Sequence, residues 1–363
     1  MNHTTRNLRI RHRIAAAATA LLVAGTGIAL AAGPAAATPP SSHAAGWLTR
    51  SSAGTVTSWG TPGTHVTLFG PLSGRYTATF HNVAGAFGAP SVAPGNQHPG
   101  AICSIDAYGN VGNDLDVTFH CSVNGGATAT DFTVTYTSIA GATEGWVDAD
   151  QAGFNGVYHP ALRYNAVSAD VTVAHNTTYA GEYLITYPGL VTLPSFGSTT
   201  ATPVTSGDGH CTTGAELWND RTVVDVHCFD AAGAPADMHF VSHIVGQRAV
   251  LATPTPKSAW AIYPNFSQHG RFVPTQAERY ASNGQKASIN HTAKGKYTFT
   301  FTNLAAAAGR GAQAFASGGP GSADVRCGAV ASTKAKDAVV TVTCTDKSAT
   351  PTDATVTANF FGI

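Results

Sequence analysis

Charged residues are scarce in this chain of 363 residues: Lys, Arg, Asp and Glu together make up only 11% of it. Methionine occurs twice, and only four of the acidic residues are glutamates. Long amphipathic helices are rich in Leu, Glu and Lys, whereas Gly, Ala, Thr and Ser dominate here. The composition therefore excludes a largely helical protein and favours strands and turns.

Several catalytic and metal-binding signatures are also absent. The sequence contains no Gly-x-Ser-x-Gly, no His-Glu-x-x-His, no phosphate-binding glycine loop and no Cys-x-x-Cys. Those motifs place a hydrolase serine, a catalytic zinc, a nucleotide phosphate or a redox dithiol. We therefore expect no catalytic residue, no metal and no cofactor.

The first 37 residues have the features of a secretory signal peptide. Arginines up to Arg13 precede an apolar run from Ile14 to Leu30, and small residues suited to cleavage lie between 31 and 38. A retained membrane anchor is the alternative, but the apolar run is short for a span. We expect a secreted, extracellular protein with no membrane attachment after cleavage.

The charge balance bears on the partner. Residues 1–37 hold four arginines and no acidic residue, so the rest of the chain carries 16 basic and 20 acidic residues and a net charge of −4. Nucleic acids and anionic membranes call for a basic surface. The net charge argues against both as main partners, which leaves an extracellular polysaccharide or protein.

Six cysteines form three pairs with separations of 18, 17 and 17 residues: Cys103 and Cys121, Cys211 and Cys228, Cys327 and Cys344. If the cysteines of a pair face each other across a hairpin, each midpoint falls on turn residues, for example between Asn219 and Asp220. The spacing predicts one cross-strand disulfide per pair in an oxidising compartment. Metal binding through His227 and Cys228 is the competing interpretation, but neighbours on a strand point to opposite faces.

Each cysteine pair belongs to a repeat of about 100 residues. A tryptophan comes first (Trp47, Trp146, Trp260), then a Gly-x-Tyr strand, then the cysteine pair, and last an aspartate (Asp131, Asp237, Asp353). We place the repeats at 44–140, 143–249 and 257–363, with 250–257 as a proline-containing linker.

Short runs with period-2 alternation dominate every repeat, such as "RYTATF", "EYLITY" and "KYTFTF". They predict an all-β protein of three tandem antiparallel β-sandwich domains, immunoglobulin-like or jelly-roll-like, each with one cross-strand disulfide. We expect the shared Trp and Tyr residues to be core or strand-pair residues.

Few residues have a claim to a binding site. Asp131, Asp237 and Asp353 recur at the head of the last strand, where an aspartate also caps a turn. His239 and His243 lie four residues apart, which places both on one face of a strand. These five are the candidates for a binding site.

The second repeat carries "CFDAAGAPAD" after its hairpin; the third keeps Pro351 and Asp353 of this pattern, and the first keeps Gly126 and Asp131. With the Gly-x-Tyr strand and the spaced cysteines, the chain resembles secreted tandem-repeat proteins of actinomycete type. The resemblance implies export and repeated β domains, and implies no activity or functional residue.

We therefore expect a secreted, non-catalytic protein that binds an extracellular or cell-surface ligand, with avidity if several modules bind similar sites. One alternative is a secreted hydrolase or hydrolase accessory that uses Asp237, His239 and His243. Another is an inhibitor or a structural protein of the envelope.

Overall fold

The computed structural model describes residues 44–363 apart from 73, 84–87, 139–142, 168, 191–196, 219, 247–256, 265–267, 308 and 318–323. The expected signal peptide and all of the expected linker but Lys257 lie outside the described residues. The described part of the chain is all-β, with one 3-10 turn at Gln276–Glu278 (η1). None of its helical segments is long and apolar enough to cross a membrane.

The strands form three consecutive groups, here called domains 1, 2 and 3. Domain 1 contains β1 (Ala45–Arg50), β2 (Val56–Gly60), β3 (Val66–Leu72), β4 (Arg75–Phe80), β5 (Ala89–Pro94), β6 (Ile102–Val111), β7 (Asp114–Val123), β8 (Gly126–Ala127) and β9 (Phe132–Thr137). Domain 2 contains β10 (Glu144–Ala149), β11 (Gly156–Tyr158), β12 (Arg163–Asn165), β13 (Thr172–His175), β14 (Glu182–Pro188), β15 (Ser198–Pro203), β16 (Gly209–Trp218), β17 (Arg221–Asp230) and β18 (Phe240–Val245). Domain 3 contains β19 (Lys257–Tyr263), β20 (Gly270–Phe272), β21 (Arg279–Ala281), β22 (Ala287–Ala293), β23 (Lys296–Phe301), β24 (Arg310–Ser317), β25 (Arg326–Lys334), β26 (Asp337–Thr345) and β27 (Thr355–Gly362).

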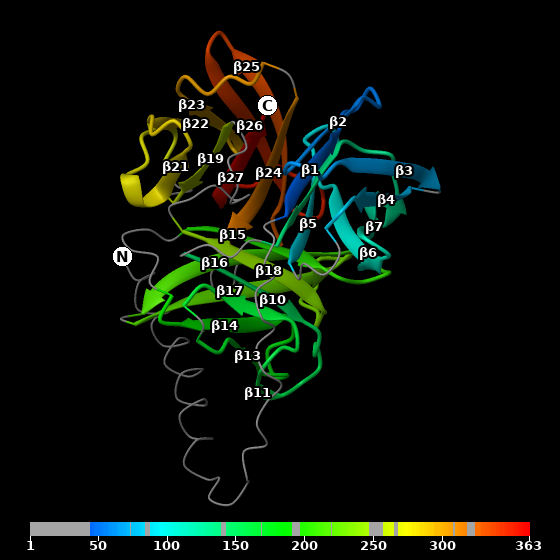
Figure 1. The fold of residues 1–363 in the computed structure, drawn as a ribbon. Helices are drawn as coiled ribbons and strands as arrows, with labels where there is room; N and C mark the ends of the chain where they lie inside the picture. Colours follow the sequence, from blue (N-terminus) through cyan, green and yellow to red (C-terminus); the bar gives the residue numbers. More distant parts are fainter. Residues whose placement is uncertain are drawn as a thin grey trace, which may run out of the picture.

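Each domain is a sandwich of two antiparallel sheets (Figure 1). The inner sheets have the strand orders β2-β1-β9-β5, β12-β10-β18-β15 and β21-β19-β27-β24. The outer sheets have the orders β3-β4-β7-β6 (with β8 beside β7), β11-β13-β14-β17-β16 and β20-β22-β23-β26-β25. The described residues of domain 1 contain no counterpart of the edge strands β11 and β20.

The outer sheets follow from the alternation seen in the sequence. In β23, Tyr297, Phe299 and Phe301 are fully buried while the residues between them are partly exposed. Side chains on a strand alternate between faces, so this pattern gives one core face and one solvent face. The Gly-x-Tyr tyrosines, Tyr76, Tyr183 and Tyr297, lie in the cores of their sandwiches as expected.

The three predicted disulfides are present, each across the last hairpin of an outer sheet. Cys211 lies opposite Cys228, and the pairing continues to Trp218 opposite Arg221. Domain 1 has one residue more between its cysteines because its hairpin carries a β-bulge at Asp106. The turns predicted from the cysteine midpoints are therefore confirmed.

Apart from the edge strands β2, β12 and β21, the inner sheets are largely buried on both faces, unlike the outer ones. Every residue of β5, β9, β15 and β18 is buried. One face packs in the sandwich, and the other packs against the next domain. Strands such as β15, with the sequence "STTATP", show no hydrophobic alternation because neither face contacts solvent.

The three domains close into a ring, in which each inner sheet packs on the next (Figure 1). The edge strand β5 packs on β10 and β18 of domain 2, β15 packs on β19 and β27 of domain 3, and β24 packs on β1 and β9 of domain 1. The disulfide strands add a second set of contacts, β6 with β15, β16 with β24 and β25 with β5. All three disulfides line a small cavity of about 40 Å³ at the centre, too small for more than water.

The shared tryptophans belong to this ring. Trp47, Trp146 and Trp260 are buried, but they pack between domains and not in the sandwich cores. Trp47 lies in a cluster with Val245 of domain 2 and Phe361 of domain 3. The tryptophans are therefore buried as expected, but they pack against the neighbouring domain and not in the core of their own sandwich.

Glycines allow the close approach of one domain to the next. A Cβ on Gly309 would lie 2.0 Å from Cγ2 of Thr57, and one on Gly311 would lie 2.5 Å from Oγ1 of Thr49. Both contacts cross from domain 3 to domain 1. A larger residue at either position would require the threonine side chain opposite it to move or the two domains to separate.

We expect Trp47→Ala to lower the free energy of unfolding by about 3–5 kcal/mol, since it removes a fully buried ring from the junction of three domains. Denaturant unfolding followed by circular dichroism measures this. Trp218→Ala is the control, because Trp218 is 41% exposed and its loss should cost less than about 0.5 kcal/mol. Equal effects of the two substitutions would contradict the ring.

Candidate functional site

The three recurring aspartates are not all equivalent. The last strands align through the residues that pair with the shared tryptophans: Thr135, His243 and Asn359. Six positions before these lie Ala129, Asp237 and Asp353, so Asp131 is two positions out of register. The expectation that all three aspartates occupy equivalent positions is therefore wrong for Asp131. The distance along the chain from the second cysteine did not reveal this two-residue shift, which only the strand register shows.

Asp237 and Asp353 each bind a buried histidine. Oδ1 of Asp237 lies 3.0 Å from Nε2 of His175 and accepts a hydrogen bond of 2.7 Å from the backbone N–H of Gly181. In domain 3, Oδ1 of Asp353 lies 2.9 Å from Nε2 of His291 and accepts a hydrogen bond of 2.6 Å from the N–H of Gly295. Each pair ties the turn of the Gly-x-Tyr hairpin to the head of the last strand.

Sequence reasoning missed these histidines, although a signal was present. His175 and Asp237 are 62 residues apart, and so are His291 and Asp353. Domain 1 lacks both members of the pair. Ala129 replaces the aspartate, and a β-bulge between Phe69 and Leu72 lies where the histidine would face the Gly-x-Tyr tyrosine.

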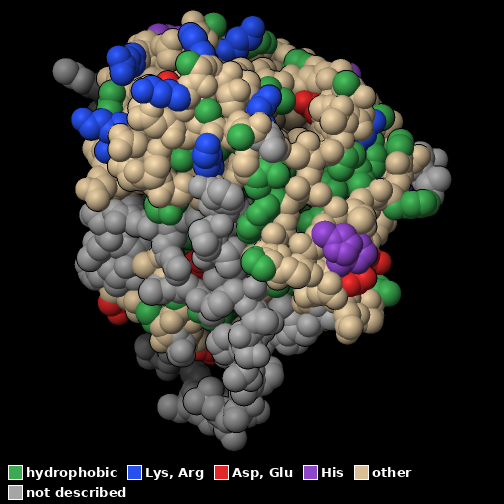
Figure 2. Space-filling model, turned by 45° about the horizontal axis from the view of Figure 1, so that its top comes forward, with side chains coloured by type: hydrophobic (Ala, Val, Ile, Leu, Met, Phe, Trp, Pro, Cys, Tyr) green, Lys and Arg blue, Asp and Glu red, His purple; other side chains and the backbone are tan. Residues whose placement is uncertain are grey.

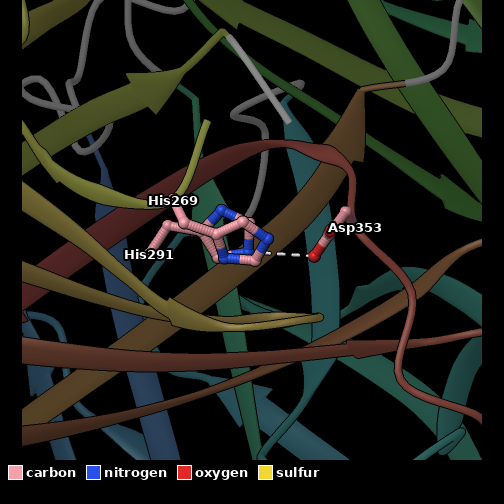
Figure 3. A group of neighbouring side chains, drawn as sticks. All are labelled: His269, His291 and Asp353. Atoms are coloured by element: carbon pink, nitrogen blue, oxygen red, sulfur yellow. Dashed lines mark hydrogen bonds and ion pairs between the residues drawn. The ribbon is translucent and has the colours of Figure 1, made fainter. Parts of the chain in front are cut away.

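Domain 3 alone adds a second histidine to the pair. The ring of His269 stacks on that of His291 with centroids 4.2 Å apart. The ligand atoms of His269, His291 and Asp353 all lie within 4.8 Å of one another (Figure 3). Domain 2 has Asn155 at the position of His269, since both residues precede the glycine that pairs with the buried histidine.

His239 and His243 belong to the junction of domains 1 and 2. Nε2 of His239 pairs with Oδ1 of Asp148, whose Oδ2 accepts a hydrogen bond of 2.7 Å from the hydroxyl of Tyr108. His243 is buried beside Trp146. Asp237 binds His175 instead, so the three residues of the hydrolase alternative have separate partners and form no joint group.

Two further histidine–aspartate pairs link successive domains, and the sequence did not indicate them. Nε2 of His120 in domain 1 lies 3.1 Å from Oδ1 of Asp208 in domain 2. Nε2 of His210 in domain 2 lies 2.7 Å from Oδ1 of Asp324 in domain 3. Burial alone would raise the pKa of Asp324, but His210 and Arg326 outweigh it and lower this pKa to about 2.

The third junction, between domains 1 and 3, contains a cleft of about 270 Å³. Polar side chains line its domain 1 side: Thr49, Arg50, Ser51, Ser52, Thr55 and Thr57. Asp131 also lines the cleft, and Arg310 contributes from domain 3. The Arg50 guanidinium donates a hydrogen bond of 3.1 Å to the carbonyl of Thr130 and lies 5.7 Å from the centroid of Tyr76, which fixes its position.

Charge is distributed very unevenly over the three domains. Residues 257–363 contain 11 basic and five acidic residues, whereas 143–249 contain three basic and 11 acidic ones, and 44–140 contain two and four. All seven lysines of the chain lie in domain 3. The net charge of −4 thus conceals a basic domain beside an acidic one.

Several basic residues gather at one end of domain 3, here called the basic end: Lys257, Lys286, Lys334, Lys336 and Arg310. The backbone of 302–305 connects Lys286 with Lys336, because Thr302 N–H donates to the carbonyl of Lys286 and Ala305 N–H donates to that of Lys336. Lys257 binds the carbonyl of Ala305.

The basic end is continuous with the cleft. Lys257 and Arg310 pair with Gly362 from its two sides, so they lie two strands apart, or about 10 Å. Figure 2 shows Lys and Arg side chains gathered over the upper part of the visible face. Lys286, Lys334 and Lys336 are exposed.

Comparisons with protein-family models, with curated proteins and with solved structures found no match.

Acid should destabilise the ring through its buried histidines. Burial lowers the pKa of His243 to about 4, from an ordinary value of 6.5. The unfolded chain therefore binds this proton at higher pH than the folded chain does. Stability from this group is complete above pH 6.5 and is lost as the pH falls from 6.5 toward 4, by up to about 3 kcal/mol.

His243→Asn, which copies Asn359 of domain 3, should remove that part of the pH dependence. Urea unfolding at a series of pH values measures it. His65→Asn, the same substitution at an exposed histidine, is the control. An unchanged slope in His243→Asn would show that His243 does not set it.

Proposed function

We propose that this chain is an exported, non-catalytic binding protein, and that it binds an anionic extracellular polysaccharide at the cleft and the basic end of domain 3. The confinement of all seven lysines to domain 3 is the observation that carries the proposal. A negatively charged protein that holds its lysines on one domain presents a local positive field to an anionic polymer.

The cleft supplies specificity that a basic surface alone lacks. Its hydroxyl groups from Thr49, Ser51 and Thr55 are donors and acceptors suited to sugar hydroxyls. Arg50 and Arg310 are suited to a carboxylate or phosphate on the polymer, because a guanidinium binds such groups with two parallel hydrogen bonds. Clefts at domain junctions are common ligand sites.

The ring changes how the repeats would contribute. The inner sheets bury one another, and the outer sheets belong to domains of opposite charge. We therefore do not propose three equivalent binding modules. The basic domain 3 and its cleft with domain 1 suit an anionic ligand best. The hydrolase alternative loses support because Asp237, His239 and His243 have separate partners.

The test is calorimetric titration with polygalacturonate, with neutral dextran as the uncharged comparison. We expect saturable binding to the acidic polymer that weakens with salt, and about tenfold weaker binding by Lys334→Glu/Lys336→Glu. Lys294→Glu/Lys296→Glu is the matched control, since it changes the charge equally in the hairpin between β22 and β23.

Equal losses in the two double variants would contradict a site at the basic end. Equally tight binding of duplex DNA or of vesicles with anionic lipid would contradict specificity for a polysaccharide and would indicate a site for polyanions in general. Absence of binding to any anionic polymer would refute the proposal.

A further inference from the structure

His291 is buried and held so that Nε2 of its ring faces Asp353. Its Nδ1–H donates a hydrogen bond of 2.8 Å to the carbonyl of Gln268, which also accepts one from the hydroxyl of Tyr263. The ring is stacked between Tyr297, at 4.6 Å, and His269, at 4.2 Å. With Nδ1 engaged as a donor, Nε2 is the atom left for a ligand.

This arrangement is the one that metal-binding histidines use. A histidine that ligates a metal usually donates its other ring N–H to a backbone carbonyl or a carboxylate, which fixes the ring and its tautomer. Nε2 of His291 points to Asp353, as Figure 3 shows. Oδ1 of Asp353 also accepts the N–H of Gly295, so the carboxylate is fixed as well.

Domain 2 shows what the pair does without a third ligand. His175 has the same contacts, with Nδ1 donating to the carbonyl of Phe154 at 2.8 Å and Nε2 at 3.0 Å from Asp237. Asn155 stands there in place of His269. The histidine–aspartate pair is thus part of the sandwich in both domains, and His269 is the addition in domain 3.

We propose that His269, His291 and Asp353 bind a divalent transition metal ion of the zinc type. Two imidazole nitrogens and one carboxylate oxygen are ligands that Zn²⁺ takes, with a fourth position left for water or an outside ligand. His269 has to leave its stack, since two parallel rings 4.2 Å apart do not direct their lone pairs to one point. That movement is open to it because its side chain is exposed, whereas His291 is buried and stays in place.

The inference does not depend on the proposed polysaccharide site. The lysines of the basic end and the cleft share no residue with the three ligands. The proposed metal site gives Asp353, a binding candidate from the sequence, the role of a metal ligand, which Asp131 and Asp237 do not share. It also departs from the expectation of no metal, which rested on the absence of sequence motifs.

The test is equilibrium dialysis and calorimetry of the untagged, metal-free protein with Zn²⁺, together with the absorption spectrum of the Co²⁺ form. We expect one saturable site in the unaltered protein and at least tenfold weaker binding in His269→Ala. His269 is exposed, so this variant should fold as before. His65→Ala is the matched control, because His65 also stacks on a histidine that pairs with an aspartate, and it should bind as the unaltered protein does.

A gain of binding provides the second arm. Asn155→His supplies the third ligand in domain 2, where His175 and Asp237 are already in place, and should raise the stoichiometry from one ion to two. Absence of saturable binding, or binding retained in His269→Ala, would overturn the proposal. An unchanged stoichiometry in Asn155→His would overturn the claim that the third ligand completes the site.

Discussion

The packing of each inner sheet on the inner sheet of the next domain is the constraint on which the rest of the structure depends. It buries β5, β15 and β24 on both faces and closes the chain into a ring. Close approach of one domain to the next depends on small residues at Gly309 and Gly311, while tryptophans such as Trp47 fill the junction elsewhere. The small residues of β5 and β15, with the sequences "APSVAP" and "STTATP", suit this packing.

The three junctions of the ring are not equivalent. A junction needs its polar atoms paired, and the pairs differ from one junction to the next. His120 with Asp208 and His210 with Asp324 pair across the first two junctions, whereas the third contains the cleft between domains 1 and 3. The proposed binding site uses this third junction, where the cleft meets the lysines of domain 3, and the proposed metal ligands around His291 lie outside the junctions.

Features that depend on neighbours along the chain were predictable from sequence. Alternating strands, cysteine spacing and turn residues gave the sandwiches and the three disulfides, because each is encoded within about 20 residues. Features that depend on contacts between domains were not. A buried tryptophan such as Trp47 gives the same sequence signal whether it lies in a sandwich core or in a junction between domains. The two-residue shift of Asp131 appears only from the strand register. The shared separation of 62 residues between His175 and Asp237 and between His291 and Asp353 was readable, yet only pairing gives it meaning.

Small-angle X-ray scattering of residues 44–363 tests the ring most directly. A closed arrangement of about 320 residues predicts a radius of gyration of about 20 Å, the value for one compact body of that size. Three sandwiches of about 100 residues strung in a row would instead give about 30 Å. A value near 20 Å supports the doubly buried inner sheets, and a value near 30 Å would contradict them.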